Sequence, residues 1–296
     1  MGRVLVVTNE LAGRTEAGAV DEVVEVLRGG GADVEVMACA DASDIDRILD
    51  ARAGRRLVVV GGDGSLHTMM GALWRRGEAA TCEVGLIPLG TGNDFARGVG
   101  IPVDDLRAAA RIVVEGTPRP FDLIVSDRGG AAVNAVHVGA GAEAARRALP
   151  LKRRLRIAAF PIGAVLAGFT TKGWRLRVSI DGRPVMRGRR RVLMAGLSNA
   201  PTIAGGTGRL GPGADPTDGL ADVTVSYAVG PLARVGYALA LRRGRHPERE
   251  DVLHTRAREV HIAGEPFHVN ADGELTGPFT ANTWRVAPAA WRLLLP

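Results

Sequence analysis

The sequence predicts an α/β fold with two lobes: an N-terminal, three-layer lobe built on a parallel sheet, and a mainly antiparallel, β-rich C-terminal lobe. From Val4 to Glu115, short apolar runs alternate with helical patterns, which favours a parallel sheet wrapped by helices. From Phe121 onward, short alternating runs and hairpin-type turns replace them. With 296 residues, 46% of them hydrophobic and 24% charged, the chain is long enough for two ordinary globular domains.

The elements of the first lobe are predicted from their local patterns. Short apolar runs rich in β-branched residues predict strands, and spacings of three and four predict helices. The predicted strands are Val4 to Asn9, Val34 to Met37, Leu57 to Val60 and one beginning at Val84, and the predicted helices are Ala17 to Leu27, Ala42 to Ala53, Leu66 to Leu73, one beginning at Phe95, and Leu106 to Glu115.

The second lobe is predicted from eight short apolar or alternating runs. Turns such as Asp181-Gly182 and Asp272-Gly273 separate them and favour hairpins. The runs are Asp122 to Ser126, Ala132 to Val138, Leu176 to Ile180, Arg191 to Leu197, Ala221 to Ser226, Val252 to Ala257, Glu259 to Ile262 and Phe267 to Asn270, and the helices are about Pro150 to Gly168 and Pro231 to Arg242.

The stretch from Leu57 to Met70 combines a buried strand, a glycine turn and a helix with Ser65 as its expected N-cap. This arrangement points backbone N–H groups and the positive end of a helix at one place, which suits a phosphate. The loop has no lysine and no Gly-x-Gly-x-x-Gly pattern, so it matches neither a P-loop nor a dinucleotide fingerprint. Asp63 would repel a phosphate unless a metal ion lies between them or a hydroxyl is held; the alternative is a tight turn with a solvated aspartate.

A second strand–glycine–helix stretch, Val84 to Arg97, follows in the chain. Gly61-Gly62-Asp63-Gly64-Ser65 together with Pro88 to Arg97 resembles the diacylglycerol kinase catalytic-domain family of lipid kinases in both order and spacing. Matching segments at Asp122-Leu123, Asn134, Ser198 to Val223 and Asp272-Gly273-Glu274 extend this resemblance over the whole chain. The chain departs from the family pattern at Glu10, where a proline is expected, and at Ser65, where a threonine is usual.

The resemblance implies a layout and a nucleotide site. The expected nucleotide lobe is residues 1–121 with a C-terminal return of 284–296, the expected lipid-substrate lobe is 122–283, and the active site is expected in the cleft between them. Phosphoryl transfer needs a held nucleotide, a metal that neutralises its phosphates and a base for the acceptor hydroxyl. The residues expected to hold ATP are Asn9, Gly61, Gly62, Asp63, Gly64, Ser65, Leu66, His67, Thr91 and Asn93.

Acidic residues are the candidates for the metal and the base. Catalytic Mg²⁺ is expected at Asp63, Asp94 and Asp122, partly through water, although Asp94 could instead cap the helix that begins at Phe95. The expected general base is Glu274, with Asp272 as its rival; the alternative is that Asp272-Gly273 is only a hairpin turn. Asp215, Asp218 and Leu220 match a structural Mg²⁺ loop of bacterial members, and the alternative there is an acidic turn without an ion.

The formal net charge of +6 comes almost wholly from arginine, in clusters around Arg146 to Arg156, Arg187 to Arg191 and Arg242 to Arg249. Such clusters attract anionic lipid or nucleic acid, but only 4% of the residues are aromatic, which argues against single-stranded nucleic acid. A basic, solvated surface is the alternative. We find no signal peptide and no bilayer-spanning run, and therefore expect a cytoplasmic, peripherally membrane-associated protein with buried Cys39 and Cys82 thiols.

The sequence thus predicts an ATP- and Mg²⁺-dependent kinase that phosphorylates the hydroxyl of diacylglycerol or a related lipid alcohol and binds no nucleic acid. A kinase of NAD or of a soluble polyol is one alternative, although Leu89 to Phe95 does not resemble the second motif of NAD kinases. A nucleotide- or lipid-binding protein without turnover is another. The identity of the acceptor and the oligomeric state, including a homodimer, stay open.

Overall fold

The computed structural model describes residues 2–9, 14–40, 43–146 and 172–296. The chain forms two compact units, Met1–Asp122 with Ala289–Pro296, and Leu123–Pro288. The sequence-based division was 1–121 with 284–296, and 122–283. The chain passes from one unit to the other within β5 (Thr117–Ser126) and again within β14 (Glu274–Leu295).

The first unit is built on a parallel sheet with strand order β14-β4-β3-β1-β2. The end of the chain completes this sheet, because Arg292 and Leu293 of β14 pair with Glu83 and Val84 of β4. Apolar, mostly β-branched side chains fill both faces of its central strand, as expected for a strand covered on both sides. The strands are β1 (Arg3–Asn9), β2 (Asp33–Cys39), β3 (Arg56–Gly61) and β4 (Glu83–Pro88).

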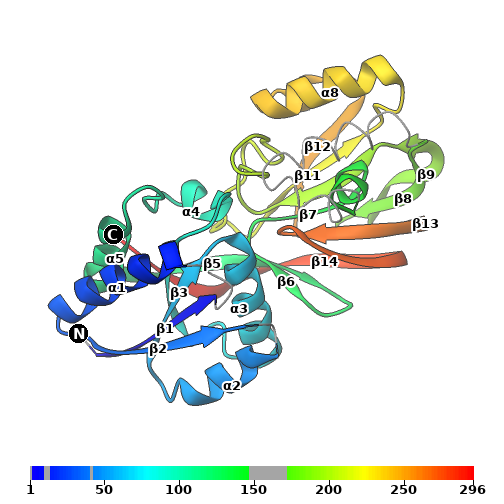
Figure 1. The fold of residues 1–296 in the computed structure, drawn as a ribbon. Coiled ribbons are helices and arrows are strands. Elements are labelled where there is room, and N and C mark those ends of the chain that lie inside the picture. Colours follow the sequence, from blue (N-terminus) through cyan, green and yellow to red (C-terminus); the bar gives the residue numbers. More distant parts are fainter. Residues whose placement is uncertain (1, 10–13, 41–42, 147–171) are drawn as a thin grey trace. The chain divides into compact units, whose positions relative to one another are not determined.

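Helices cover both faces of this sheet, which confirms the predicted three layers. α1 and α5 pack together on one face, and α2 and α3 lie on the other (Figure 1). The helices are α1 (Arg14–Gly29), α2 (Asp44–Ala51), α3 (Asp63–Arg75), α4 (Asp94–Gly98) and α5 (Leu106–Glu115). The expectation that Ser65 caps its helix is wrong, because α3 begins three residues before Leu66, at Asp63, with Gly62 as N-cap.

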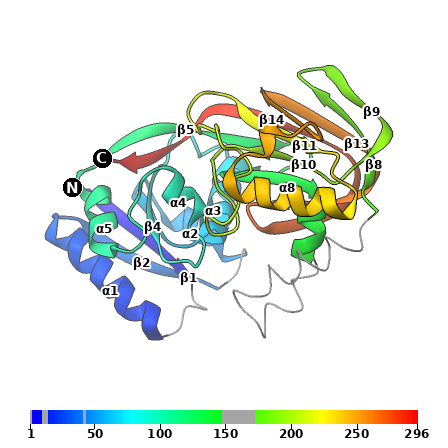
Figure 2. The same cartoon turned by 90° about the horizontal axis from the view of Figure 1, so that it is seen from above.

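The second unit is mainly antiparallel, as predicted, with strand order β12-β11-β10-β7-β13-β14 and a β8–β9 hairpin paired to β13. Helix α8 (Pro231–Arg243) packs against the start of β10, where Tyr237 contacts Met194 (Figure 2). The strands are β6 (Ala131–Ala132), β7 (Ala135–Gly139), β8 (Trp174–Ile180), β9 (Arg183–Val192), β10 (Met194–Ser198), β11 (Ala221–Ser226), β12 (Val252–Ala257) and β13 (Glu259–Ala271), and a 3₁₀ turn spans His246–Glu248.

Several predicted boundaries in this unit are wrong. The run Ala132 to Val138 is two strands, and the run Arg191 to Leu197 breaks at Leu193 into the end of β9 and the start of β10. Conversely, Glu259 to Ile262 and Phe267 to Asn270 belong to the single strand β13, whose register shifts between Ala263 and Val269. A bulge of this kind interrupts the alternation of inward and outward side chains, so one strand resembles two.

Some expectations fall outside the described residues: the helix at about Pro150 to Gly168, the basic residues between 147 and 156, and the turn that contains Glu10. None of the helices within the described ranges has the length and apolar character needed to span a bilayer. Cys39 is half-buried, and Cys82 is buried, which raises the pKa of its thiol to about 11.

Candidate active site

The two glycine loops predicted from the sequence meet at one edge of the parallel sheet. β3 and β4 are neighbouring parallel strands with Gly61 opposite Pro88. The loops that follow their carboxyl ends therefore begin at the same place. The Leu89 N–H donates to the Gly61 carbonyl at 3.0 Å, and a Cβ atom on Gly90 would lie 2.5 Å from the Cα of Gly62. Glycine is therefore needed at position 90 because the two backbones touch.

Asn93 holds the second loop in shape. Its backbone adopts the left-handed conformation, with φ of 53°, which asparagine tolerates better than most residues. Its side-chain Nδ2 donates to the Gly90 carbonyl at 2.8 Å, and its Oδ1 accepts the Gly90 N–H at 3.0 Å. An amide is suited to this role because it both donates and accepts. Asn93, which was expected to contact the nucleotide, is buried and stabilises the conformation of the loop.

Asp63 of the first loop joins the two motifs. Its Oδ2 accepts the Asp94 N–H at 3.0 Å and its Oδ1 accepts the Phe95 N–H at 3.1 Å. These are first-turn donors of α4, which have no partner within the helix. The alternative that Asp94 caps a helix starting at Phe95 is wrong, because α4 begins at Asp94 with Asn93 as N-cap, and Asp63 accepts its first N–H groups.

An aromatic cluster positions Asp122 in the same unit. The rings of Phe95, Phe121 and Trp291 lie 5.5 to 5.9 Å apart, centroid to centroid. Asp122 is 1% exposed, its Oδ1 accepts the Ala289 N–H at 2.8 Å, and its carbonyl accepts the Trp291 Nε1–H at 3.2 Å. The packing of Phe121 on Phe95 brings the segment that carries Asp122 against the start of α4.

The described residues contain no group of three or more His, Cys, Asp or Glu side chains arranged to hold a metal ion. Asp63, Asp94 and Asp122 therefore do not form a closed cage. Mg²⁺ is commonly bound by only one or two carboxylates, with waters and substrate phosphates completing its octahedron. The hard carboxylate oxygens of Asp63 and Asp94, which are joined through the bond between Asp63 and the Asp94 backbone, fit that kind of open site.

The remaining residues expected at the nucleotide differ in accessibility. Gly64, Gly90 and Thr91 are exposed, whereas Ser65 and His67 are half-buried on the first turns of α3, and Leu66 is fully buried with its side chain in the core. A narrow hollow with no room for a water molecule lies between the two loops. Its lining is Gly61, Gly62, Asp63, Leu66, Leu86, Pro88, Asn93 and Ala96. Asn9 ends β1, so its backbone lies at the same edge of the sheet.

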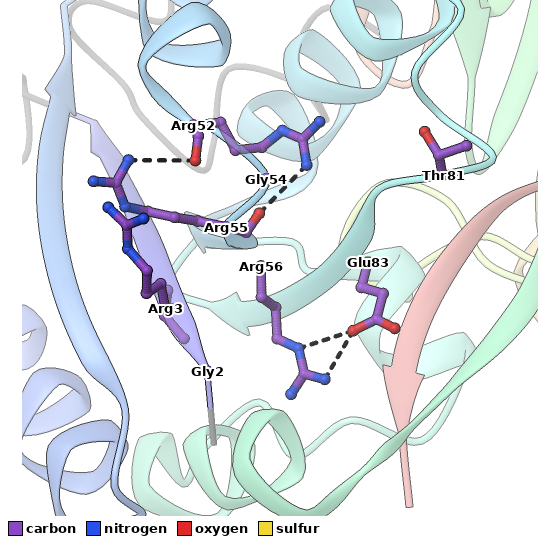
Figure 3. A pocket seen from close by; sticks show the side chains of 9 residues that line it. Gly2, Arg3, Arg52, Gly54, Arg55, Arg56, Thr81 and Glu83 are labelled. Carbon is purple, nitrogen blue, oxygen red and sulfur yellow. Dashed lines mark hydrogen bonds and ion pairs between the residues drawn. The ribbon is translucent and has the colours of Figure 1, made fainter.

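A larger hollow of about 380 Å³ lies at the opposite edge, where β1, β3 and β4 begin (Figure 3). Three of its four arginines are closely paired: Arg56 with Glu83 at 2.8 Å, Arg55 with Glu35 at 2.9 Å, and Arg52 with Glu78 at 3.1 Å. The fourth, Arg3, lies 3.9 Å from Asp33. Because the carboxylates neutralise these guanidinium groups, the hollow presents little net charge to an anion.

In the second unit, the structure separates the roles of Asp272 and Glu274. Asp272, with φ of 51°, accepts three backbone N–H groups: Val133 at 2.7 Å, Ala135 at 2.8 Å and Asn134 at 3.0 Å. It therefore ties the β13–β14 turn to the start of β7. Glu274 is exposed and makes no side-chain hydrogen bond or ion pair with any described residue. Of the two carboxylates, only Glu274 accepts no hydrogen bond from a described residue.

His137 lies in β7 near this turn and was not identified from the sequence. Burial lowers the pKa of His137 to about 4, and the nearby Asp272 carboxylate opposes this shift only in part. The imidazole is therefore neutral at pH 7. Its position in a buried strand carries no sequence pattern that distinguishes it from an ordinary core residue.

The acidic loop from Asp215 to Leu220 is internally bonded. Asp215 Oδ1 accepts the Thr217 N–H at 3.0 Å, and Asp218 Oδ1 accepts the Leu220 N–H at 3.0 Å. Asp218 also forms an ion pair with Arg256 of β12, which raises the pKa of that arginine. Arg256 carries no signal in the sequence that links it to this loop, and its guanidinium already places positive charge beside Asp218.

A parallel-sheet unit with paired glycine loops at its carboxyl edge is an arrangement that suits the phosphates of a nucleotide. The model of the diacylglycerol kinase catalytic domain matches residues 3–126, and that of the YegS C-terminal NAD kinase beta sandwich-like domain matches residues 134–295. A diacylglycerol kinase of Mycobacterium tuberculosis strain H37Rv is 31% identical over 100% of this chain and 96% of its own length. The chain therefore belongs to the diacylglycerol kinase catalytic-domain family, as the resemblance indicated.

Two further relatives are more distant. A diacylglycerol kinase of Bacillus subtilis strain 168 is 24% identical over 86% of this chain and 84% of its own length. The crystal structure of a diacylglycerol kinase from Bacillus anthracis strain Sterne superimposes with a TM-score of 0.73 at 17% identity, covering 99% of this chain and 97% of the other. This similarity confirms the predicted fold class.

Proposed function

We propose that this protein transfers the terminal phosphoryl group of ATP to the hydroxyl of a lipid alcohol, most simply diacylglycerol, giving phosphatidate. The observation that supports this most strongly is the junction of the two glycine loops, where Gly62 touches Gly90 and Asp63 bonds to the start of α4. The names of the mycobacterial and Bacillus subtilis relatives support diacylglycerol as the acceptor.

In this proposal, backbone groups of the first unit hold the nucleotide. The N–H groups at the start of α3, at Gly64 and Ser65, have no acceptor within the helix and suit phosphate oxygens. Thr91 is exposed at the tip of the neighbouring loop and can donate its hydroxyl. Mg²⁺ held by Asp63, Asp94 or Asp122 together with water would neutralise the phosphates.

Glu274 is proposed as the general base that takes the proton of the acceptor hydroxyl. An alcohol is weakly acidic, so a carboxylate that is not engaged by protein donors is best suited to receive its proton in the transition state. Asp272 has three backbone donors and is proposed to position the turn on which Glu274 stands.

We further propose that the protein is cytoplasmic and binds peripherally to anionic membrane, because a lipid acceptor resides there. The structural Mg²⁺ proposed at Asp215, Asp218 and Leu220 has a physical requirement. An ion that binds the Asp218 side chain has to share it with Arg256 or displace Arg256 from it.

ADP release is the measurement that tests the proposed activity. With ATP, Mg²⁺ and vesicles containing diacylglycerol, we expect ADP release and a product heavier than the lipid by one phosphate. Asp63→Ala and Glu274→Ala should abolish both signals and leave the far-UV circular dichroism unchanged. ADP release with NAD or a soluble polyol, and none with lipid, would instead indicate the alternative kinases. Nucleotide binding without ADP release under any condition would indicate a non-catalytic protein.

A further inference from the structure

Helix α8 is apolar on two opposite sides. One side packs onto the core of the second unit, where the buried Tyr237 hydroxyl contacts the Met194 sulfur at 3.3 Å. The residues of this inner side are spaced by four: Ala233, Tyr237 and Leu241. A surface helix that needs only to cover a core has polar residues on its outer side, whereas α8 does not follow this pattern.

The outer side of α8 carries Leu232, Val235 and Leu239, with 88%, 50% and 52% of their surfaces exposed. Their spacing of three and four residues places them in one stripe along the helix. Only two other large apolar residues in the described ranges, Val36 and Val185, are exposed, and they lie on separate strands. We call Leu232, Val235 and Leu239 the outer stripe.

Positive charge lies at one end of the outer stripe. Arg242 and Arg243 occupy the last turn of α8, are exposed, and form no ion pair with a residue of known placement. Arg245 follows just after the helix and is paired with Glu248 at 2.7 Å. The apolar stem of an arginine can lie along an apolar surface while its guanidinium extends to neighbouring anions.

We propose that the outer stripe inserts into the interfacial layer of an anionic bilayer, with Arg242 and Arg243 against the lipid phosphates. A helix with a projecting apolar face and basic residues at its edge is the usual form of an interfacial helix, which lies in the membrane plane. The net charge of +6 favours an anionic surface over a second copy of this chain, which carries the same charge. This inference rests on the proposed function, which places the acceptor lipid in such a bilayer.

Vesicle co-sedimentation tests the proposal. The vesicles are phosphatidylcholine alone, or equal parts of phosphatidylcholine and phosphatidylglycerol. We expect the double variant Leu232→Ser/Leu239→Ser to lose about 100-fold in partitioning to the anionic vesicles, about tenfold for each leucine. Arg242→Gln/Arg243→Gln should lose about 25-fold on the anionic vesicles, about fivefold for each arginine, and should not change on phosphatidylcholine.

The matched control is Val36→Ser, which removes a valine of similar exposure, 43%, from β2 in the other unit. It should bind vesicles within about twofold of wild type, since it replaces a side chain outside the proposed surface. Equal losses in Val36→Ser and Leu232→Ser/Leu239→Ser would overturn the assignment. So would wild-type protein that does not sediment with anionic vesicles, or a leucine variant that sediments like wild type.

Two further measurements distinguish membrane docking from the proposed kinase function and from a dimer interface. With a short-chain diacylglycerol dissolved as monomers, Leu232→Ser/Leu239→Ser should turn over at the wild-type rate, whereas its rate on vesicles should fall with its binding. If no lipid is phosphorylated but vesicle binding follows the pattern above, membrane docking stands and the proposed function fails. If the leucine variants change the mass in light scattering from dimer to monomer without changing vesicle binding, the outer stripe is a dimer interface and the proposal is overturned.

Discussion

Replacing Gly90 with alanine should separate the two glycine loops by a calculable amount. The new Cβ would lie 2.5 Å from the Gly62 Cα and 2.8 Å from the Asn93 Oδ1. Carbon atoms normally approach to about 3.5 Å, so the loops must move apart by about 1 Å. Overpacking of this kind costs about 1–3 kcal/mol, and a displacement of about 1 Å at a reacting group can reduce turnover about 100-fold.

The matched control for Gly90→Ala is Gly71→Ala, in the interior of α3, where an added Cβ meets no heavy atom within 4 Å. This control should keep full activity and gain about 0.5–1 kcal/mol of stability, because alanine favours a helix. We would measure ATP affinity by calorimetry, turnover by ADP release and the free energy of unfolding in urea. A Gly90→Ala protein that matches Gly71→Ala in all three measurements would refute the idea that loop contact shapes the nucleotide site.

Three further predictions follow from individual carboxylates and histidines. Asp63→Asn should lose one of the two acceptors for the N–H groups at the start of α4. We expect urea titrations to show a free energy of unfolding lower by about 1–3 kcal/mol, and ADP release to stop. Unchanged stability would argue against the hydrogen bonds between Asp63 and α4. Glu274→Gln should stop turnover and leave the melting temperature unchanged. Asp272→Asn should lower the melting temperature, because only Asp272 accepts backbone N–H groups. The reverse pattern in calorimetry would mean that Glu274 is the structural carboxylate and Asp272 is not. His137 has a folded-state pKa of about 4 against 6.5 in the unfolded chain, so only the unfolded chain takes up a proton as the pH falls from 6.5 to 4. The free energy of unfolding should therefore decline by about 3 kcal/mol across that pH range. In urea titrations, His137→Gln should make this dependence on pH weaker. Some dependence should remain, because the pKa of His246 is shifted in the same direction.

Local patterns were sufficient to predict the elements that carry the site. The apolar run before Gly61 and the one before Gly90 each identify a strand, and adjacent parallel strands release their loops at one edge. Local patterns could not predict the hydrogen bonds that join Asp63 of the first glycine loop to the start of α4. Asp63 accepts donors 31 and 32 residues further along the chain, so its carboxylate carries no signal at its own position. The same holds for Ser65, which has the composition of an N-cap but lies inside α3.

Strand β9 was missed for a related reason. Its residues Arg187, Arg189, Arg190 and Arg191 were interpreted as a charge cluster, although the strand is mostly exposed and needs few apolar side chains. Its pairing with β8 supplies the backbone hydrogen bonds that fix it, from Arg183 opposite Ile180 to Val192 opposite Trp174. An exposed edge strand with charged side chains is well suited to resist aggregation, and this composition conceals it from periodicity arguments.

The contacts that shape the nucleotide loops all lie within the first unit: Gly62 against Gly90, Asn93 with Gly90, and Asp63 with the start of α4. The proposed base, Glu274, belongs to the second unit. Nucleotide binding and proton removal therefore depend on separate sets of contacts, and damage to one should leave the other intact. Glu274→Gln should therefore bind ATP as tightly as wild type while failing to turn over, whereas Gly90→Ala should lose affinity for ATP itself. If the two variants instead lose ATP affinity together, binding requires both units at once, and the assignment of the nucleotide site to the first unit alone is wrong.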